Sequence, residues 1–151
     1  MIKSLISDER RRILLVDDQN SIRDCVYTLL EGAGYEVLAA RNGPEGLTIF
    51  HRSLQRVDLL VTDYNIPGMT GLELAEACAR RDSNVGVLFI SGSDPNEELQ
   101  AALVATRRAF LLKPFQGNEL LRKVKELFVP GFDPEPVPEP PRLQLATQLS
   151  R

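Results

Sequence analysis

Five polar side chains in this chain come directly after short apolar runs, and their types suggest a shared chemistry. They are Asp17, Asp18, Asp63, Ser91 and Lys113. Carboxylates held close together raise one another's pKa, so a cluster of three aspartates is costly unless a cation neutralises it. Carboxylate oxygens, together with the oxygens of Asn65, suit Mg²⁺, which keeps several of its waters in protein sites. The residues therefore predict a magnesium site.

The same set of residues can also hold an anion. Lys113 adds a second positive charge, which together with the metal can bind a phosphoryl group beside Asp63. A positioned carboxylate can accept a phosphoryl group as an acyl phosphate while the metal screens the developing charge. Ser91 can then donate a hydrogen bond to a phosphoryl oxygen. These residue types indicate phosphoryl transfer onto Asp63.

Each of these residues also has a simpler explanation. Asp17 and Asp18 can stabilise the start of the helix that follows them, because acidic side chains favour helix N-termini. Asp63 can form a turn, Ser91 can belong to an ordinary loop, and Lys113 can be a surface lysine. The presence of all five in one chain favours the chemical interpretation over these separate structural ones.

The five residues act together only if the fold brings them to one place. Apolar runs predict strands at 13–16, 35–40, 59–61, 85–90 and 110–112. Helical periodicity predicts a helix that Ser21 caps and that Gly32 or Gly34 ends, and further helices at 44–54, 72–81, 96–105 and 118–128. Five such β-α units predict an α/β fold, a doubly wound five-stranded parallel sheet with helices on both faces. Ligands bind beyond the carboxyl ends of strands in such sheets, where the five polar residues lie.

Composition restricts the class of protein and divides the chain. The 151 residues carry a net charge of -3, and no apolar run reaches the length of a membrane span. We therefore expect a cytoplasmic domain that binds neither nucleic acid nor membrane. Cys25 and Cys78 are predicted to be buried thiols, and His51 has no predicted role. Residues 1–11 are expected to lead into a domain at 12–128, followed by a proline-rich linker or tail at 129–151 that is largely disordered.

Four segments of the chain resemble the signature blocks of a known family. They are LLVDDQNSIRD, LLVTDYNIPGMTGLEL, LFISGSD and FLLKPF. They are similar to the conserved blocks of the receiver domain of two-component response regulators, and the resemblance spans residues 12–128. It implies a flavodoxin-like sheet with strand order 2-1-3-4-5.

The resemblance also implies a role for each site residue. Asp63 would be phosphorylated by a histidine kinase or a histidine phosphotransfer protein. Asp18, Asp63 and the backbone carbonyl of Asn65 would ligate Mg²⁺, and Asp17 would hold the metal through water. Lys113 would pair with the phosphoryl group, and the Lys113–Pro114 peptide bond is expected to be cis.

A switch follows from the same resemblance. Ser91 and Phe110 match the hydroxyl and aromatic switch positions of the family. Ser91 would move toward the phosphoryl group, and Phe110 would rotate into the space that Ser91 leaves. This movement would remodel the surface made by the helix at 96–105, the strand at 110–112 and the helix at 118–128. A downstream protein would bind this surface, with homodimerisation on phosphorylation as an open alternative. Asn65 and Ser93 occupy positions that tune the lifetime of the phosphoryl group. Neither supplies a base for water, so self-dephosphorylation is expected to be slow.

The chain departs from the family pattern before Phe110. Thr106 and Arg107 stand where a Gly-Ala pair is common, so a different turn is expected there. Arg107 and Arg108 are expected to make the end of the preceding helix basic. Partner recognition on this face is therefore expected to differ from that of typical members.

The leading hypothesis is a phosphorylation-controlled signalling module that is a phosphoacceptor and not an enzyme with substrate turnover. No DNA-binding output domain is expected in this sequence. Two alternatives stay open: an aspartyl-nucleophile phosphohydrolase, and a pseudo-receiver that docks partners without being phosphorylated. Nucleotide binding is weakly supported, because neither G-x-G-x-x-G nor G-x-x-x-x-G-K-[ST] occurs.

Overall fold

A computed structural model describes residues 10–105 and 107–128. Its strands are β1 (Arg12–Val16), β2 (Glu36–Ala40), β3 (Leu59–Asp63), β4 (Gly86–Ser91) and β5 (Arg108–Leu112). Its helices are α2 (Asn20–Gly32), α3 (Gly43–Arg52), α4 (Gly71–Arg81), α5 (Glu97–Ala102) and α6 (Gly117–Leu127). All strand pairs are parallel and the order is β2-β1-β3-β4-β5, which confirms the predicted sheet. The predicted tail at 129–151, and most of the predicted lead-in, lie outside the described residues.

The central strands are buried on both faces of the sheet. Every residue of β3 and β4 is buried, as are the last four residues of β1. Leu60 of β3 lies between Leu14 of β1 and Val87 of β4 in register. This burial explains why these strands read as continuous apolar runs in the sequence and show no alternation of apolar and polar residues.

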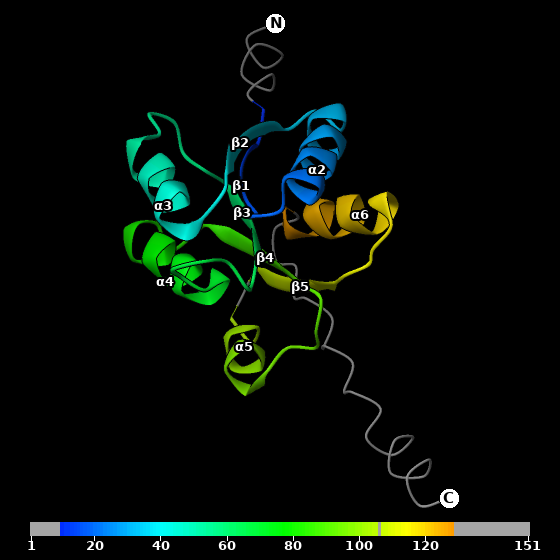
Figure 1. Ribbon diagram of the computed structural model, residues 1–151. Helices are drawn as coiled ribbons and strands as arrows, with labels where there is room; N and C mark the ends of the chain where they lie inside the picture. The colour runs from blue at the N-terminus through cyan, green and yellow to red at the C-terminus, as the bar shows by residue number, and fades with distance from the viewer. Residues whose placement is uncertain (1–9, 106, 129–151) are drawn as a thin grey trace, which may run out of the picture.

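Helices cover both faces of the sheet (Figure 1). Helices α3, α4 and α5 lie on one face, and α2 and α6 lie on the other. Successive residues of a strand point to opposite faces, so Leu14 packs in the α3–α5 layer and Leu15 packs in the α2–α6 layer. Two apolar clusters thus hold the sheet between them and fix the strand ends that carry the polar residues.

The helix starts are set mainly by capping side chains, with one correction to the sequence prediction. Asn42, Thr70 and Asn96 each accept a backbone hydrogen bond at the start of α3, α4 and α5 respectively. Ser21 was expected to cap α2, but α2 already begins at Asn20 and its N-cap position is Gln19. The Gln19 backbone N–H donates instead to the Asp17 carboxylate at 2.9 Å. The start of α2 is therefore tied to the predicted metal site.

The region before Phe110 also differs from the prediction. Helix α5 ends at Ala102, three residues earlier than expected, and Arg107 has a positive φ of 59°. Arg108 belongs to β5, where it is buried and pairs with Glu76 of α4 at 2.9 Å. Arg108 therefore does not contribute to a basic helix end, because its backbone pairs with Val87 of β4 and its side chain pairs with Glu76.

One of the two cysteine predictions is wrong. Cys78 is buried in α4 as expected, whereas Cys25 of α2 is exposed. Cys25 lies on the outer side of α2, while its neighbour Val26 packs into the core. Within residues 10–105 and 107–128, none of the helices is long and apolar enough to cross a membrane.

Candidate metal centre

The sheet places the predicted residues at one edge. Asp17 directly follows β1, Asp63 and Ser91 are the last residues of β3 and β4, and Lys113 directly follows β5. Strand β3 lies between β1 and β4, so Asp63 occupies the middle of this edge. The structure thus brings together residues that are up to 96 positions apart in the chain, from Asp17 to Lys113.

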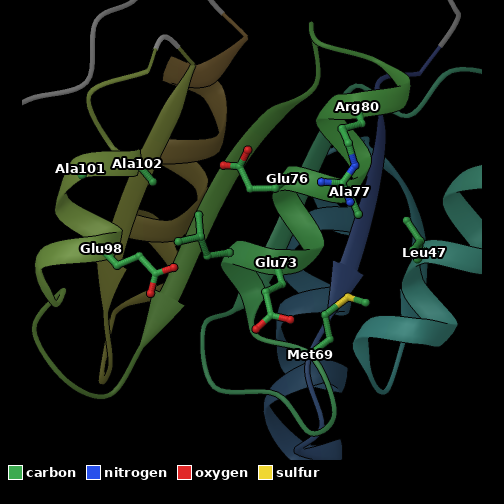
Figure 2. A pocket seen from close by; sticks show the side chains of 10 residues that line it. Leu47, Met69, Glu73, Glu76, Ala77, Arg80, Glu98, Ala101 and Ala102 are labelled. Atoms are coloured by element: carbon green, nitrogen blue, oxygen red, sulfur yellow. The ribbon is translucent and has the colours of Figure 1, made fainter.

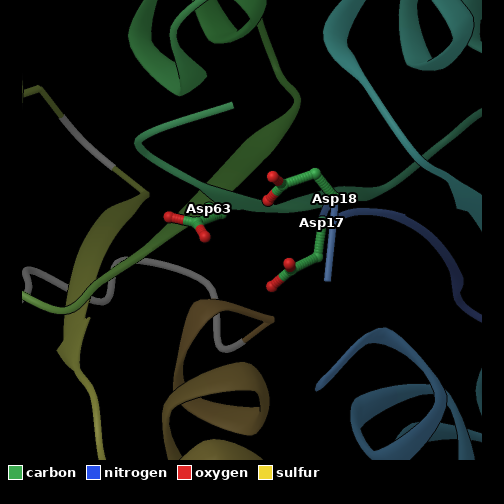
Figure 3. Close-up of side chains that lie close together, drawn as sticks. All are labelled: Asp17, Asp18 and Asp63. Atoms are coloured by element: carbon green, nitrogen blue, oxygen red, sulfur yellow. The ribbon is translucent and has the colours of Figure 1, made fainter. Parts of the chain in front are cut away.

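Three carboxylates converge at this edge (Figure 3). Asp17, Asp18 and Asp63 each offer a carboxylate oxygen, and these atoms all lie within 4.8 Å of one another. Asp17 and Asp63 are buried, whereas Asp18 is exposed. The cluster therefore has a buried side against the sheet and an open side through which an ion can enter.

Lys113 contacts the buried side of the cluster. Its Nζ lies 2.9 Å from Asp63 Oδ2 and 3.5 Å from Asp17 Oδ2. Burial lowers the pKa of Lys113, but the hydrogen bond to Asp63 and the charges of Asp17 and Asp63 outweigh burial and raise the pKa above its ordinary value. Lys113 is therefore a stable positive charge. The Lys113–Pro114 peptide bond is cis, as predicted.

The buried position of Asp17 disfavours its ionised form, because the carboxylate loses contact with water. Burial raises the pKa of Asp17, and the charges of Asp63 and Asp18 raise it further, against the backbone hydrogen bond from Gln19 and the charge of Lys113. When ionised, three carboxylates and one ammonium leave two negative charges uncompensated. A divalent cation with oxygen preference would balance them, so the donor set fits Mg²⁺.

The loop after β3 is shaped around Asp63. The Asn65 backbone N–H donates to Asp63 Oδ1 at 3.2 Å. This bond brings the first residues of the loop back toward the carboxylate cluster. Asn65 itself is exposed, and its role as a metal ligand stays a prediction.

Two residues that support the site were not predicted. Arg23 of α2 donates to the Asp17 backbone oxygen at 2.7 Å. Gly71, the first residue of α4, packs against the backbone of Asp63 and Tyr64 so closely that a Cβ would overlap the Asp63 carbonyl oxygen. The Gly71 backbone N–H also donates to the Tyr64 backbone carbonyl oxygen at 2.7 Å. Both residues lie within segments that resemble the family's signature blocks, LLVDDQNSIRD and LLVTDYNIPGMTGLEL, but the sequence assigned a role to neither, because both act through contacts between separate elements.

The predicted switch residues lie on β4 and β5, the two strands that follow β3 in the sheet. Ser91 is buried and its Oγ accepts a hydrogen bond from the Ser93 N–H at 3.3 Å. Phe110 pairs in register with Phe89, and Ser91 is two residues beyond Phe89 on β4. Ser91 and Phe110 therefore point to the same face of the sheet, the one that α3, α4 and α5 cover. Their roles as switch residues stay predictions.

Several known proteins resemble the chain. The chemotaxis protein CheY of Pseudomonas aeruginosa is 32% identical over 120 residues, which are 78% of this chain and 95% of that protein. The uncharacterized transcriptional regulatory protein YrkP of Bacillus subtilis is 35% identical over 113 residues. The match covers 75% of this chain but 47% of YrkP, so the chain spans about half the length of that relative.

Solved structures share the fold. Chemotaxis protein CheY4 of Vibrio cholerae superposes with a TM-score of 0.72 at 30% identity, over 79% of this chain and 99% of that protein. Response regulator protein TrrA of Thermotoga maritima, solved in complex with Mg²⁺ and BeF, gives a TM-score of 0.69 at 30% identity, over 78% of this chain and 99% of that protein.

Fold and site together define a flavodoxin-like α/β domain with an acidic cluster and a lysine at the carboxyl edge of its sheet. The family model of the response regulator receiver domain matches residues 13–125. The chain therefore belongs to the response regulator receiver domain family of two-component systems.

Proposed function

We propose that this chain accepts a phosphoryl group on Asp63 from a histidine kinase or a histidine phosphotransfer protein. One observation carries the proposal: Lys113 Nζ lies 2.9 Å from Asp63 within a cluster of three carboxylates that has an open side. Asp18, Asp63 and the backbone carbonyl of Asn65 would hold Mg²⁺, and Asp17 would hold it through water. The phosphoacceptor domain would extend over residues 12–128, with the proline-rich stretch at 129–151 as its linker or tail.

The transfer uses the residues already described. Asp63 attacks phosphorus, so a phosphorus–oxygen bond forms while the bond to the donor histidine nitrogen breaks. The metal, when bound, screens the negative charge of the transferring group. Lys113 keeps its proton and pairs with the phosphoryl oxygens. Ser91 donates its hydroxyl hydrogen to one of these oxygens.

The proposed output is a change of surface. Movement of Ser91 toward the phosphoryl group would open space for Phe110 and remodel the face made by α5, β5 and α6, to which a downstream protein binds. A homodimer formed on phosphorylation is the alternative output. The domain would act in the cytoplasm. Asn65 and Ser93 supply no base for water, so self-dephosphorylation would be slow.

The position of the acceptor aspartate argues against the hydrolase alternative. An aspartyl-nucleophile phosphohydrolase normally carries its nucleophile after the first strand and covers its substrate with a cap. Here Asp63 ends β3, and short connections join the described elements. A pseudo-receiver without phosphorylation is the alternative that experiment must separate.

The test is direct labelling of the intact chain. Incubation with acetyl phosphate and Mg²⁺ should add one phosphoryl group by intact mass, and beryllium fluoride with Mg²⁺ should change the amide NMR spectrum around Asp63. Asp63→Asn should abolish both responses. Asp24→Asn, which removes an exposed carboxylate on α2, serves as the matched control and should be labelled normally.

Three results would count against the proposal. Labelling that persists in Asp63→Asn would place the acceptor elsewhere. A lack of labelling and of Mg²⁺ binding in the unmodified chain would favour the pseudo-receiver. Continuous turnover of a small phosphate ester would favour the phosphohydrolase.

A further inference from the structure

A groove with an apolar floor and an acidic rim lies outside the metal centre (Figure 2). It occupies about 640 Å³ and runs over the outer side of α4, with α5 and α3 beside it. Leu72, Met69 and three alanines form much of its floor: Ala77, Ala101 and Ala102. Small residues at these positions leave room for the side chains of a partner.

The rim of the groove is mainly acidic. Glu73 and Glu76 stand on α4, and Glu98 stands on α5. Glu76 already pairs with Arg108, and Arg80 is the one cationic side chain among the described residues that line the groove. Glu73 and Glu98 therefore remain to attract a positive group. A complementary segment would carry arginine or lysine next to aliphatic side chains.

We propose that the distal segment of this chain, residues 142–151, docks in this groove. The segment reads RLQLATQLSR, with arginines at both ends, three leucines between them and no acidic residue. The leucines match the apolar floor, and the arginines match Glu73 and Glu98.

The other segments outside the described fold do not match the groove in this way. Residues 129–141 carry three acidic side chains and no basic one, and residues 1–9 carry two acidic side chains and one lysine. Charge therefore selects residues 142–151, because like charges would repel the other two segments from the acidic rim.

Chain connectivity allows the contact. The side chain of Arg107 donates to the backbone oxygen of Leu127, the last residue of α6. It also donates to the backbone oxygen of Asn84, which lies just after α4. The chain thus leaves α6 close to one end of α4. The thirteen residues at 129–141 can span up to about 45 Å, whereas the 11 residues of α4 extend over about 16 Å. Tethering also sets a local concentration in the millimolar range, so a weak contact suffices.

Docking there would connect the segment to the metal centre. Helix α5 forms one wall of the groove, and its N-cap Asn96 donates to the Tyr64 hydroxyl at 3.1 Å. Tyr64 directly follows Asp63. A segment held between α4 and α5 would thus restrict the movement of α5 relative to the Asp63 loop.

The experiment is paramagnetic relaxation enhancement on the full chain. A nitroxide is attached at Ser150→Cys in a Cys25→Ser background, and the amide signals of Ala77, Ala101 and Ala102 are followed. We expect these signals to lose more than half of their intensity. A nitroxide at Ser4→Cys serves as the matched control and should leave them unchanged.

Charge variants show whether the acidic rim is responsible. Glu73→Gln with Glu98→Gln should restore most of the lost intensity. Glu73→Lys with Glu98→Lys should abolish the broadening, and adding Arg142→Glu with Arg151→Glu should restore it, which a general loss of folding would not do.

Two results would overturn the proposal. Unchanged alanine signals in the unmodified chain would show that the segment does not dock. Equal broadening when isotope-labelled protein without a nitroxide is mixed with a separate nitroxide-labelled copy would show that the groove binds a second copy of the chain instead.

Discussion

Replacement of Asp18 by asparagine tests whether the carboxylate cluster is strained when no cation is present. Asp18 is exposed, whereas the other two carboxylates have partners: Asp17 accepts from Gln19, and Asp63 accepts from Lys113. Asp18→Asn removes the charge with the least support from the fold, at almost constant volume. We expect the ion-free domain to become more stable.

The magnitude follows from the geometry of the cluster. The carboxylate oxygens lie within 4.8 Å of one another, and two unit charges at that limit repel by about 1 kcal/mol in a water-like medium and about 3 kcal/mol at an effective dielectric constant of 20. Asp18 is exposed, so the lower value applies to each of its two pairs, and attraction by Lys113 offsets part of the sum. A gain of about 1 kcal/mol is expected, or about 4 °C in Tm for a domain of this size.

The assay is urea unfolding followed by circular dichroism, because the chain has no tryptophan. In EDTA, Asp18→Asn should be more stable than the unmodified chain. Mg²⁺ at ten times its Kd should stabilise the unmodified chain by about 1.4 kcal/mol and the variant much less. Asp24→Asn makes the same change of charge away from the cluster and should follow the unmodified chain. If Asp18→Asn is less stable in EDTA, or if Mg²⁺ stabilises both proteins equally, the reasoning is refuted.

Two other predictions concern the packing around the site and the thiols. Gly71→Ala should lower the unfolding free energy by about 1–3 kcal/mol, because the new Cβ overlaps the Asp63 backbone. Gly32→Ala is the control in the same urea assay: nothing lies within 4 Å of its new Cβ, so it should raise the unfolding free energy by up to about 1 kcal/mol. Equal effects of the two substitutions would contradict this account. Burial raises the pKa of Cys78 to about 12, so a thiol reagent at pH 8 should label Cys25 and spare Cys78 until the domain unfolds. The raised pKa also affects the pH dependence of stability. At low pH the thiol of Cys78 is neutral in both the folded and the unfolded protein and has no effect, whereas above about pH 9 it ionises only in the unfolded protein, so the unfolding free energy should fall until about pH 12. Rapid labelling of both thiols in folded protein would contradict the burial of Cys78.

Local patterns predicted most of the fold. The buried strands β3 and β4 read as unbroken apolar runs because helices cover both faces of the sheet. Right-handed crossovers leave few ways to wind such a chain, and the order of its strands was predicted from the family resemblance. The ends of elements were less predictable. Strand β3 extends through Asp63, two residues beyond its apolar run, because the partner strand holds these residues in register.

Residue type and position by themselves determined which side chains meet in the site. Asp17, Asp63 and Lys113 each lie at the carboxyl end of a predicted strand, and parallel strands bring those ends to one edge. Only tertiary structure decided the charge balance and the support of that edge. Three contacts join residues from separate elements: Lys113 contacts two carboxylates, Arg23 donates to the Asp17 backbone oxygen, and Arg108 of the sheet pairs with Glu76 of α4. Such contacts depend on how the elements pack in three dimensions, and local sequence carries no record of that packing.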